Sequence, residues 1–148
     1  MKTGIAKGPP RPPVITQTFA SEEISPGDTW KIYLRAKDSE GEMKAIHATV
    51  DQPGRGPQTA GSIPVPEGQR RELSGFLYLN TSGIQGGAFL NLTLTIRIRD
   101  GSGHFSQPVS FPLALNPRAV QESPPLGAFP ESELGPIMVS LDAGTGGS

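Results

Sequence analysis

Apolar and polar residues alternate most strictly between Ala88 and Asp100, and this pattern predicts the strongest strand of the chain. The residues of one face are Leu90, Leu92, Leu94, Ile96 and Ile98, and those of the other are Asn91, Thr93, Thr95, Arg97 and Arg99. A period of two is typical of a β-strand with one buried and one hydrated face. A glycine-rich corner follows at Asp100, and then a second strand with Val109, Phe111, Leu113 and Leu115 inward. The two strands predict a hairpin.

Five more segments have strand patterns. Between Thr29 and Asp38, Trp30, Ile32, Leu34 and Ala36 share the inward face, and in Met43–Val50 the inward residues are Ile46, Ala48 and Val50. Pro13–Phe19 is a first strand, and Ser62–Val65 fits a short edge strand, where proline is tolerated. In Arg71–Asn80 both faces are apolar, since Leu73, Leu77 and Leu79 oppose Phe76 and Tyr78, so the core face stays open.

Six or seven strands, frequent turn signals and no helical period predict an all-β, antiparallel sandwich or barrel. The chain has 19 Gly and 16 Pro, which lie between the periodic segments and toward both ends. We expect a flexible proline-rich arm at 1–12, a sandwich at 13–116 and a Pro/Gly-rich extension at 117–148.

Composition limits the function. A formal net charge of −1 argues against nucleic-acid binding, which needs a clearly basic surface. No apolar run approaches the ~18 residues of a membrane span, so we expect no membrane insertion. Without cysteine the chain has no disulfide, thiolate metal site or cysteine nucleophile. No signal peptide is visible at Met1, so we expect a cytoplasmic protein or one whose leader was replaced.

Two segments resemble a known superfamily. SPGDTWKIYLRAKDSEGE is similar to the second strand and following turn of bacterial immunoglobulin-like and fibronectin type III-like modules. LTLTIRIRDGSGHFSQPVSF resembles their last hairpin, and Trp30 lies where fibronectin-type modules bury a tryptophan. The resemblance spans Pro13 to Leu115; the tyrosine corner and the Cys…Trp…Cys pattern are absent. It implies an immunoglobulin-like sandwich and an extracytoplasmic setting, either periplasmic or at the cell surface.

Acidic turn residues are the first candidate site. In an immunoglobulin-like order, Asp38, Glu40 and Glu42 approach Asp100 at one end of the sandwich, where carboxylates and turn carbonyls can bind calcium weakly. The alternative is that these acids cap backbone donors in ordinary turns, and we favour it. No other cofactor is expected.

The chain offers little for catalysis. His47 and His104 are its two histidines, no GxSxG nucleophile motif occurs, and Ser102, His104 and Asp100 are too close in one hairpin to form a triad. We therefore predict no enzyme. The alternative function is carbohydrate binding by an exposed aromatic platform drawn from Tyr33, Phe76, Tyr78, Phe89 and Phe105.

The extension contains a further alternating stretch. Ile137, Val139 and Leu141 share one side of a predicted strand at Gly135–Asp142, beyond a linker of about twenty residues. Such a strand can add to the edge of its own sandwich or of a neighbour, which makes these residues candidates for partner binding or self-association. We thus expect a non-enzymatic structural or protein-interaction module of a bacterial surface, periplasmic or secreted protein.

Overall fold

The computed structural model describes residues 11–53, 56–81 and 90–138, and its regular structure is almost entirely β-strand. The strands are β1 (Val14–Ala20), β2 (Glu23–Ile24), β3 (Thr29–Lys37), β4 (Met43–Gln52), β5 (Gly56–Pro64), β6 (Glu72–Asn80), β7 (Leu90–Asp100), β8 (Val109–Leu115) and β9 (Glu133–Pro136). The one helix within these ranges is a 3-10 turn, η2 (Glu67–Gln69). The all-β prediction is confirmed, with nine strands in the described ranges instead of about seven.

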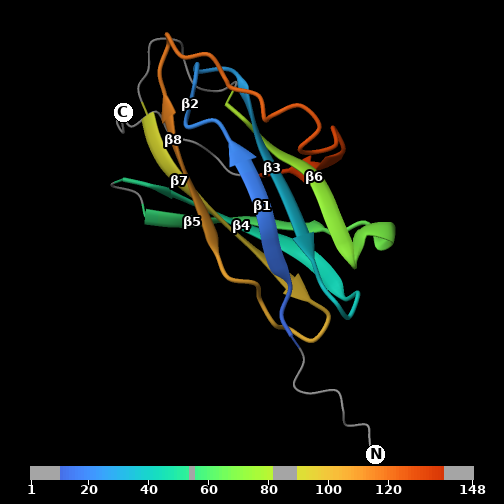
Figure 1. Ribbon diagram of the computed structural model, residues 1–148. Coiled ribbons are helices and arrows are strands. Elements are labelled where there is room, and N and C mark those ends of the chain that lie inside the picture. The colour runs from blue at the N-terminus through green and yellow to red at the C-terminus, as the bar shows by residue number, and fades with distance from the viewer. Residues whose placement is uncertain (1–10, 54–55, 82–89, 139–148) are drawn as a thin grey trace, which may run out of the picture.

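The strands form two sheets that pack face to face (Figure 1). The four-stranded sheet has the order β1-β3-β6-β9, and the five-stranded sheet has the order β2-β8-β7-β4-β5. We name the two ends of the sandwich by β3. The Lys37 end includes Val14 and Glu72, which pair with Lys37, and the Thr29 end includes Asn80, which pairs with Thr29.

One core fills the space between the sheets. It contains the predicted inward residues of β3 and, from β7, Leu92, Leu94, Ile96 and Ile98, which are each at most 3% exposed. Trp30 is fully buried, as predicted, and its indole Nε1 donates a hydrogen bond to the Ser21 carbonyl oxygen at 2.8 Å. The buried indole therefore has its hydrogen bond satisfied, as large buried rings with a polar atom normally do.

Two strands differ from the sequence prediction. The edge strand predicted at Ser62–Val65 is longer, because β5 begins at Gly56 and pairs with β4 along its length, with a register shift between His47 and Thr49. β2 was not predicted, and it pairs in parallel with the end of β8 through Glu23 and Ile24. Two residues have no readable period, so only the structure shows that the chain crosses between the sheets here.

The C-terminal segment belongs to the same fold. The structure places its strand at Glu133–Pro136, earlier than the predicted Gly135–Asp142, and pairs it in parallel with β6. Leu134 and Ile137 join the main core. Gly135 permits a close approach, since a Cβ there would lie 2.7 Å from Ile63 of β5. β9 thus lies between β6 of one sheet and β5 of the other, and it closes that side of the sandwich.

Residues 117–132, predicted to be a linker, lie on the outer face of the four-stranded sheet and are called the strap below. The Gln121 side chain accepts a hydrogen bond from Lys31 N at 2.9 Å and donates one to Thr29 O at 2.8 Å. These are backbone groups of β3, beyond the point where β1 ends. Ser25 Oγ also donates to Ala119 O at 2.6 Å, so side chains hold the strap to the Thr29 end.

Candidate functional site

The two acidic turns contact each other through their backbones. The turn after β3 contacts the corner after β7, where Gly101 N donates to Glu42 O at 2.9 Å. The carboxylates, however, serve their own turns. Asp38 accepts from Glu40 N and Glu42 N, both at 3.1 Å, and Asp100 Oδ1 accepts from Ser102 N at 2.9 Å.

These contacts assign Asp38 and Asp100 to turn stabilisation. Their side chains are buried, at 2% and 1% exposure, whereas Glu42 is exposed and Glu40 is half-buried. Among the described residues, no three or more His, Asp and Glu side chains come close enough to hold a metal ion. Asp100 Oδ2 has no hydrogen bond to any described residue and lies 3.5 Å from His104 Nδ1.

The outer face of the four-stranded sheet is aromatic and covered. Tyr33 of β3 and Phe76 of β6 lie 5.5 Å apart between ring centroids, and Phe129 of the strap packs 5.6 Å from Tyr33. These three rings are 4–9% exposed and form a second hydrophobic cluster. The two-faced apolar pattern of β6 is thereby explained: Leu73, Leu77 and Leu79 face the sandwich core, and Phe76 and Tyr78 face the strap.

Polar groups of the strap complete this cover. The Arg35 Nε donates to the Ala128 carbonyl oxygen at 2.8 Å, and the Tyr33 hydroxyl donates to Glu131 Oε2 at 2.9 Å. Burial, the hydrogen bond to Glu131 and its charge together raise the pKa of Tyr33 to about 12. A hydrogen bond to Glu133 and, less strongly, burial raise the pKa of Tyr78.

This cover overturns the expectation that the aromatic residues of the face are exposed. Tyr33 and Phe76 lie beneath Phe129 and are not exposed as a sugar platform; Phe105 lies on the other sheet, and Phe89 is outside the described residues. Lys31 of the same face also contacts the strap, since its Nζ lies 3.5 Å from Glu131 Oε1.

Of the three residues proposed for partner binding, one lies within the described residues and two lie outside them. Ile137 is 3% exposed, and its amide donates to Tyr78 O at 2.8 Å, so its side chain contributes to its own core and presents no surface to a partner. Val139 and Leu141 lie outside the described residues.

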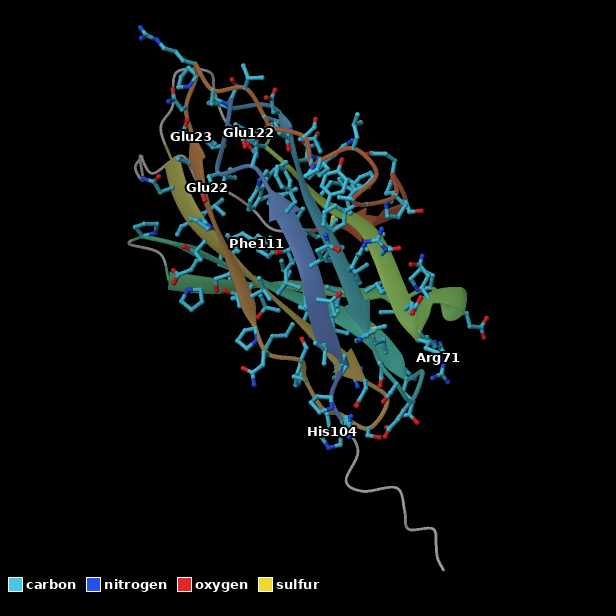
Figure 2. All side chains as sticks on the ribbon, viewed as in Figure 1. Glu22, Glu23, Arg71, His104, Phe111 and Glu122 are labelled. Carbon is cyan, nitrogen blue, oxygen red and sulfur yellow. The ribbon has the colours of Figure 1, made fainter. Side chains whose placement is uncertain are left out.

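The outer face of the five-stranded sheet is polar and has a different charge at each end. At its middle, Thr95 of β7 lies between Thr49 of β4 and Ser110 of β8, and its hydroxyl is 3.0 Å from Ser110 Oγ. Toward the Thr29 end, a cavity of about 450 Å³ is lined by Thr93 and three acids, Glu22, Glu23 and Asp51. Figure 2 shows Glu22, Glu23 and Glu122 gathered at this end, opposite His104.

Toward the Lys37 end the same face is basic. Arg97 lies opposite His47 in the register of β7 and β4, and Arg99 lies opposite Ala45. The Arg97 guanidinium carbon is 4.3 Å from the ring centroid of Phe105, and the His47 ring packs edge-on at 5.3 Å. Burial and the charges of Arg99 and Arg97 lower the pKa of His47.

Sequence reasoning missed this basic cluster. The four residues come from three segments, namely β4, β7 and the stretch after β7, so their proximity depends on strand register, which the alternation does not specify. The available signal was that Arg97 and Arg99 interrupt a face of Asn and Thr.

Comparison of the chain with protein families, with curated proteins and with solved structures gave no match. Within the described ranges, no helix is long and apolar enough to cross a membrane.

Proposed function

We propose that this chain is an immunoglobulin-like module with a non-enzymatic structural or protein-interaction role in a bacterial surface, periplasmic or secreted protein. The observation that carries the proposal is the strand order. Immunoglobulin-like sandwiches place strands A, B, E and D in one sheet and C, F and G in the other, and variable types add a C′ strand. Here β1, β3 and β6 correspond to A, B and E, and β4, β7 and β8 correspond to C, F and G.

The remaining strands support this correspondence and add a difference. β5 lies beside β4 as C′ lies beside C, and β9 occupies the place of strand D next to β6. Strand D belongs to an antiparallel sheet, whereas β9 is parallel to β6. The C-terminal segment thus supplies this edge strand, whereas in the usual immunoglobulin-like order the strand at this place comes from the middle of the sequence.

Two features suit a module that contacts other proteins. β1 starts at the Lys37 end and β9 points toward the Thr29 end, so neighbouring domains can be joined in series. The strap covers one outer face, whereas the outer face of the five-stranded sheet is open and polar, with a basic and an acidic end. A partner that binds a sheet face therefore meets the five-stranded sheet.

The test is site-specific photo-crosslinking in the producing bacterium. A photoreactive residue at Thr95, on the open face, should give an adduct of one discrete mass. The matched control is Glu67 in η2, which is exposed and away from that face. No adduct from Thr95, or the same adducts from Glu67, contradicts the interaction role.

A further inference from the structure

The basic cluster consists of His47, Arg97, Arg99 and Phe105, which the register brings to the Lys37 end of the open face. Directly opposed side chains have Cβ atoms about 5 Å apart, which applies to His47 and Arg97. Phe105 joins through an isolated bridge to Arg99. Ser62 of β5 lies on the other side of His47, so a hydroxyl borders the cluster.

Contacts within the cluster hold the guanidinium of Arg97 and leave its donors free. A guanidinium stacked on a ring uses its flat face, and its N–H groups point outward in the plane. Phe105 provides that ring at 4.3 Å and is itself packed against His47. A side chain that is already oriented loses less conformational freedom on binding, which favours affinity.

The positive charge of the cluster is not neutralised within the described part of the chain. No carboxylate there lies within ion-pair distance of Arg97 or Arg99, and Arg99 makes one long hydrogen bond, 3.4 Å, to the Asp100 carbonyl oxygen. Among the described residues, the enclosed His47 Nε2 has no hydrogen-bond partner. Burial lowers the pKa of His47 first, and the uncompensated charges of Arg99 and Arg97 lower it further.

The charge distribution of the face indicates what size of anion fits. Asp51 pairs with Thr93 and His47 pairs with Arg97, so the acidic and basic ends are four residues, or about 13 Å, apart. A long polyanion that runs along the sheet meets repulsion from Asp51, Glu22 and Glu23. A single carboxylate avoids it, because screening in physiological salt acts over about 8 Å. Paired N–H groups of arginine also match a carboxylate.

We propose that His47, Arg97, Arg99 and Phe105 form a binding site for a carboxylate side chain of an acidic segment in a partner protein. The two arginines donate to the carboxylate oxygens, Phe105 holds Arg97 in place, and His47 adds positive charge when it is protonated. The proposal rests on the interaction role proposed above and gives the chemistry of the partner.

The test is a nuclear magnetic resonance titration of the whole chain with a capped glycine–glutamate peptide. The matched probe is the same peptide with glutamine in place of glutamate, and inorganic sulfate is a third. We expect saturable shifts at the Arg97 and Arg99 Nε–H signals with the glutamate peptide and none with the glutamine peptide. Arg97→Gln and Arg99→Gln should each weaken binding about five- to tenfold.

Controls separate the site from general charge effects. Arg118→Gln removes the same charge from an exposed residue at the Thr29 end and should leave the affinity unchanged. Phe105→Leu keeps an apolar side chain without the aromatic face and should weaken binding about threefold. Peptide binding that survives Arg97→Gln and Arg99→Gln, or sulfate that binds as well as the peptide, overturns the proposal.

The outcome is independent of the photo-crosslinking test. An adduct from Thr95 without peptide binding refutes the carboxylate site alone. Peptide binding without an adduct refutes the interaction role in the producing bacterium alone.

Discussion

Replacing Phe129 with alanine removes the ring that covers the outer aromatic cluster. Phe129 is 9% exposed, lies 5.6 Å from Tyr33 and has the Arg35 guanidinium carbon 5.8 Å from its centroid. Buried aromatic-to-alanine changes cost about 3–5 kcal/mol. Because this ring packs on the sheet from one side only, we expect the lower end, about 3 kcal/mol of unfolding free energy. Urea denaturation measures it, and a smaller slope would show that the strap has frayed.

Tyr33 reports on the same substitution independently. Its pKa of about 12 depends first on burial under the strap, so admitting water should lower the pKa toward the usual value of about 10. A Tyr78→Phe background leaves Tyr33 as the single tyrosine, since the chain has two. Tyrosinate absorbance as a function of pH then gives the pKa directly.

The pH dependence of stability has a definite sign. The folded-state pKa of Tyr33 lies above the unfolded value of about 10, so the folded state retains this proton longer. The stabilisation is complete below pH ~10, and about 2 to 3 kcal/mol is lost as pH rises to ~12. Phe129→Ala should reduce that loss. The control is Leu126→Ala, which truncates a fully exposed strap side chain. If Phe129→Ala lowers the unfolding free energy by less than about 1 kcal/mol and leaves the pKa of Tyr33 unchanged, the strap does not act as a cover.

Four further outcomes are expected. Trp30→Ala should cost about 3–5 kcal/mol, and native emission as red-shifted as that of free tryptophan would contradict its burial. Truncation after Asn116 should lower the melting temperature without changing the number of subunits, because β9 and the strap dock on their own chain. An unchanged melting temperature would contradict this. Calcium and chelator should give nearly equal melts, since Asp38 and Asp100 are used by their turns, and a difference of about ten degrees would show a tight site instead. Because the pKa of His47 is lowered in the folded state, the unfolded state takes up this proton first as pH falls below ~6.5. Stability should therefore fall in this pH range, and His47→Gln should make the fall smaller. Equal pH profiles of stability for the two proteins would contradict this prediction.

Alternation was sufficient where one face of a strand is apolar and the other is mainly polar. The inward residues of β3 and, in β7, those from Leu92 to Ile98 follow from the period of two, and the burial of Trp30 follows with them. The same period could not orient β6, since both of its faces are apolar, one packing in the sandwich core and one against the strap. Apolar residues on both faces of an antiparallel strand were the signal that a further segment lies over the sheet.

The position of β9 depends on contacts that the sequence does not display. A Cβ at Gly75 would lie 2.3 Å from the Ser132 carbonyl oxygen, so the C-terminal segment can pack this close to β6 only because residue 75 is glycine. Gly135 plays the same part against Ile63. The aliphatic run that starts at Ile137 indicated a strand, but the two glycines set the register. The turn roles of Asp38 and Asp100 were predictable from local chemistry, because Asp38 lies three residues before Gly41 and Asp100 directly precedes Gly101.

The directions of β1 and β9 have a mechanical consequence. Tension applied to the chain on both sides of the fold acts along the strands, since β1 starts at the Lys37 end and β9 points toward the Thr29 end. Under that load β1 slides along β3 and β9 slides along β6, so the hydrogen bonds of each pair are strained together in shear. The bonds from Phe76 N to Ser132 O and from Ile137 N to Tyr78 O are part of this set. Forced unfolding follows the rate of crossing the unfolding barrier, and a module loaded in shear keeps its length until a whole row of bonds ruptures.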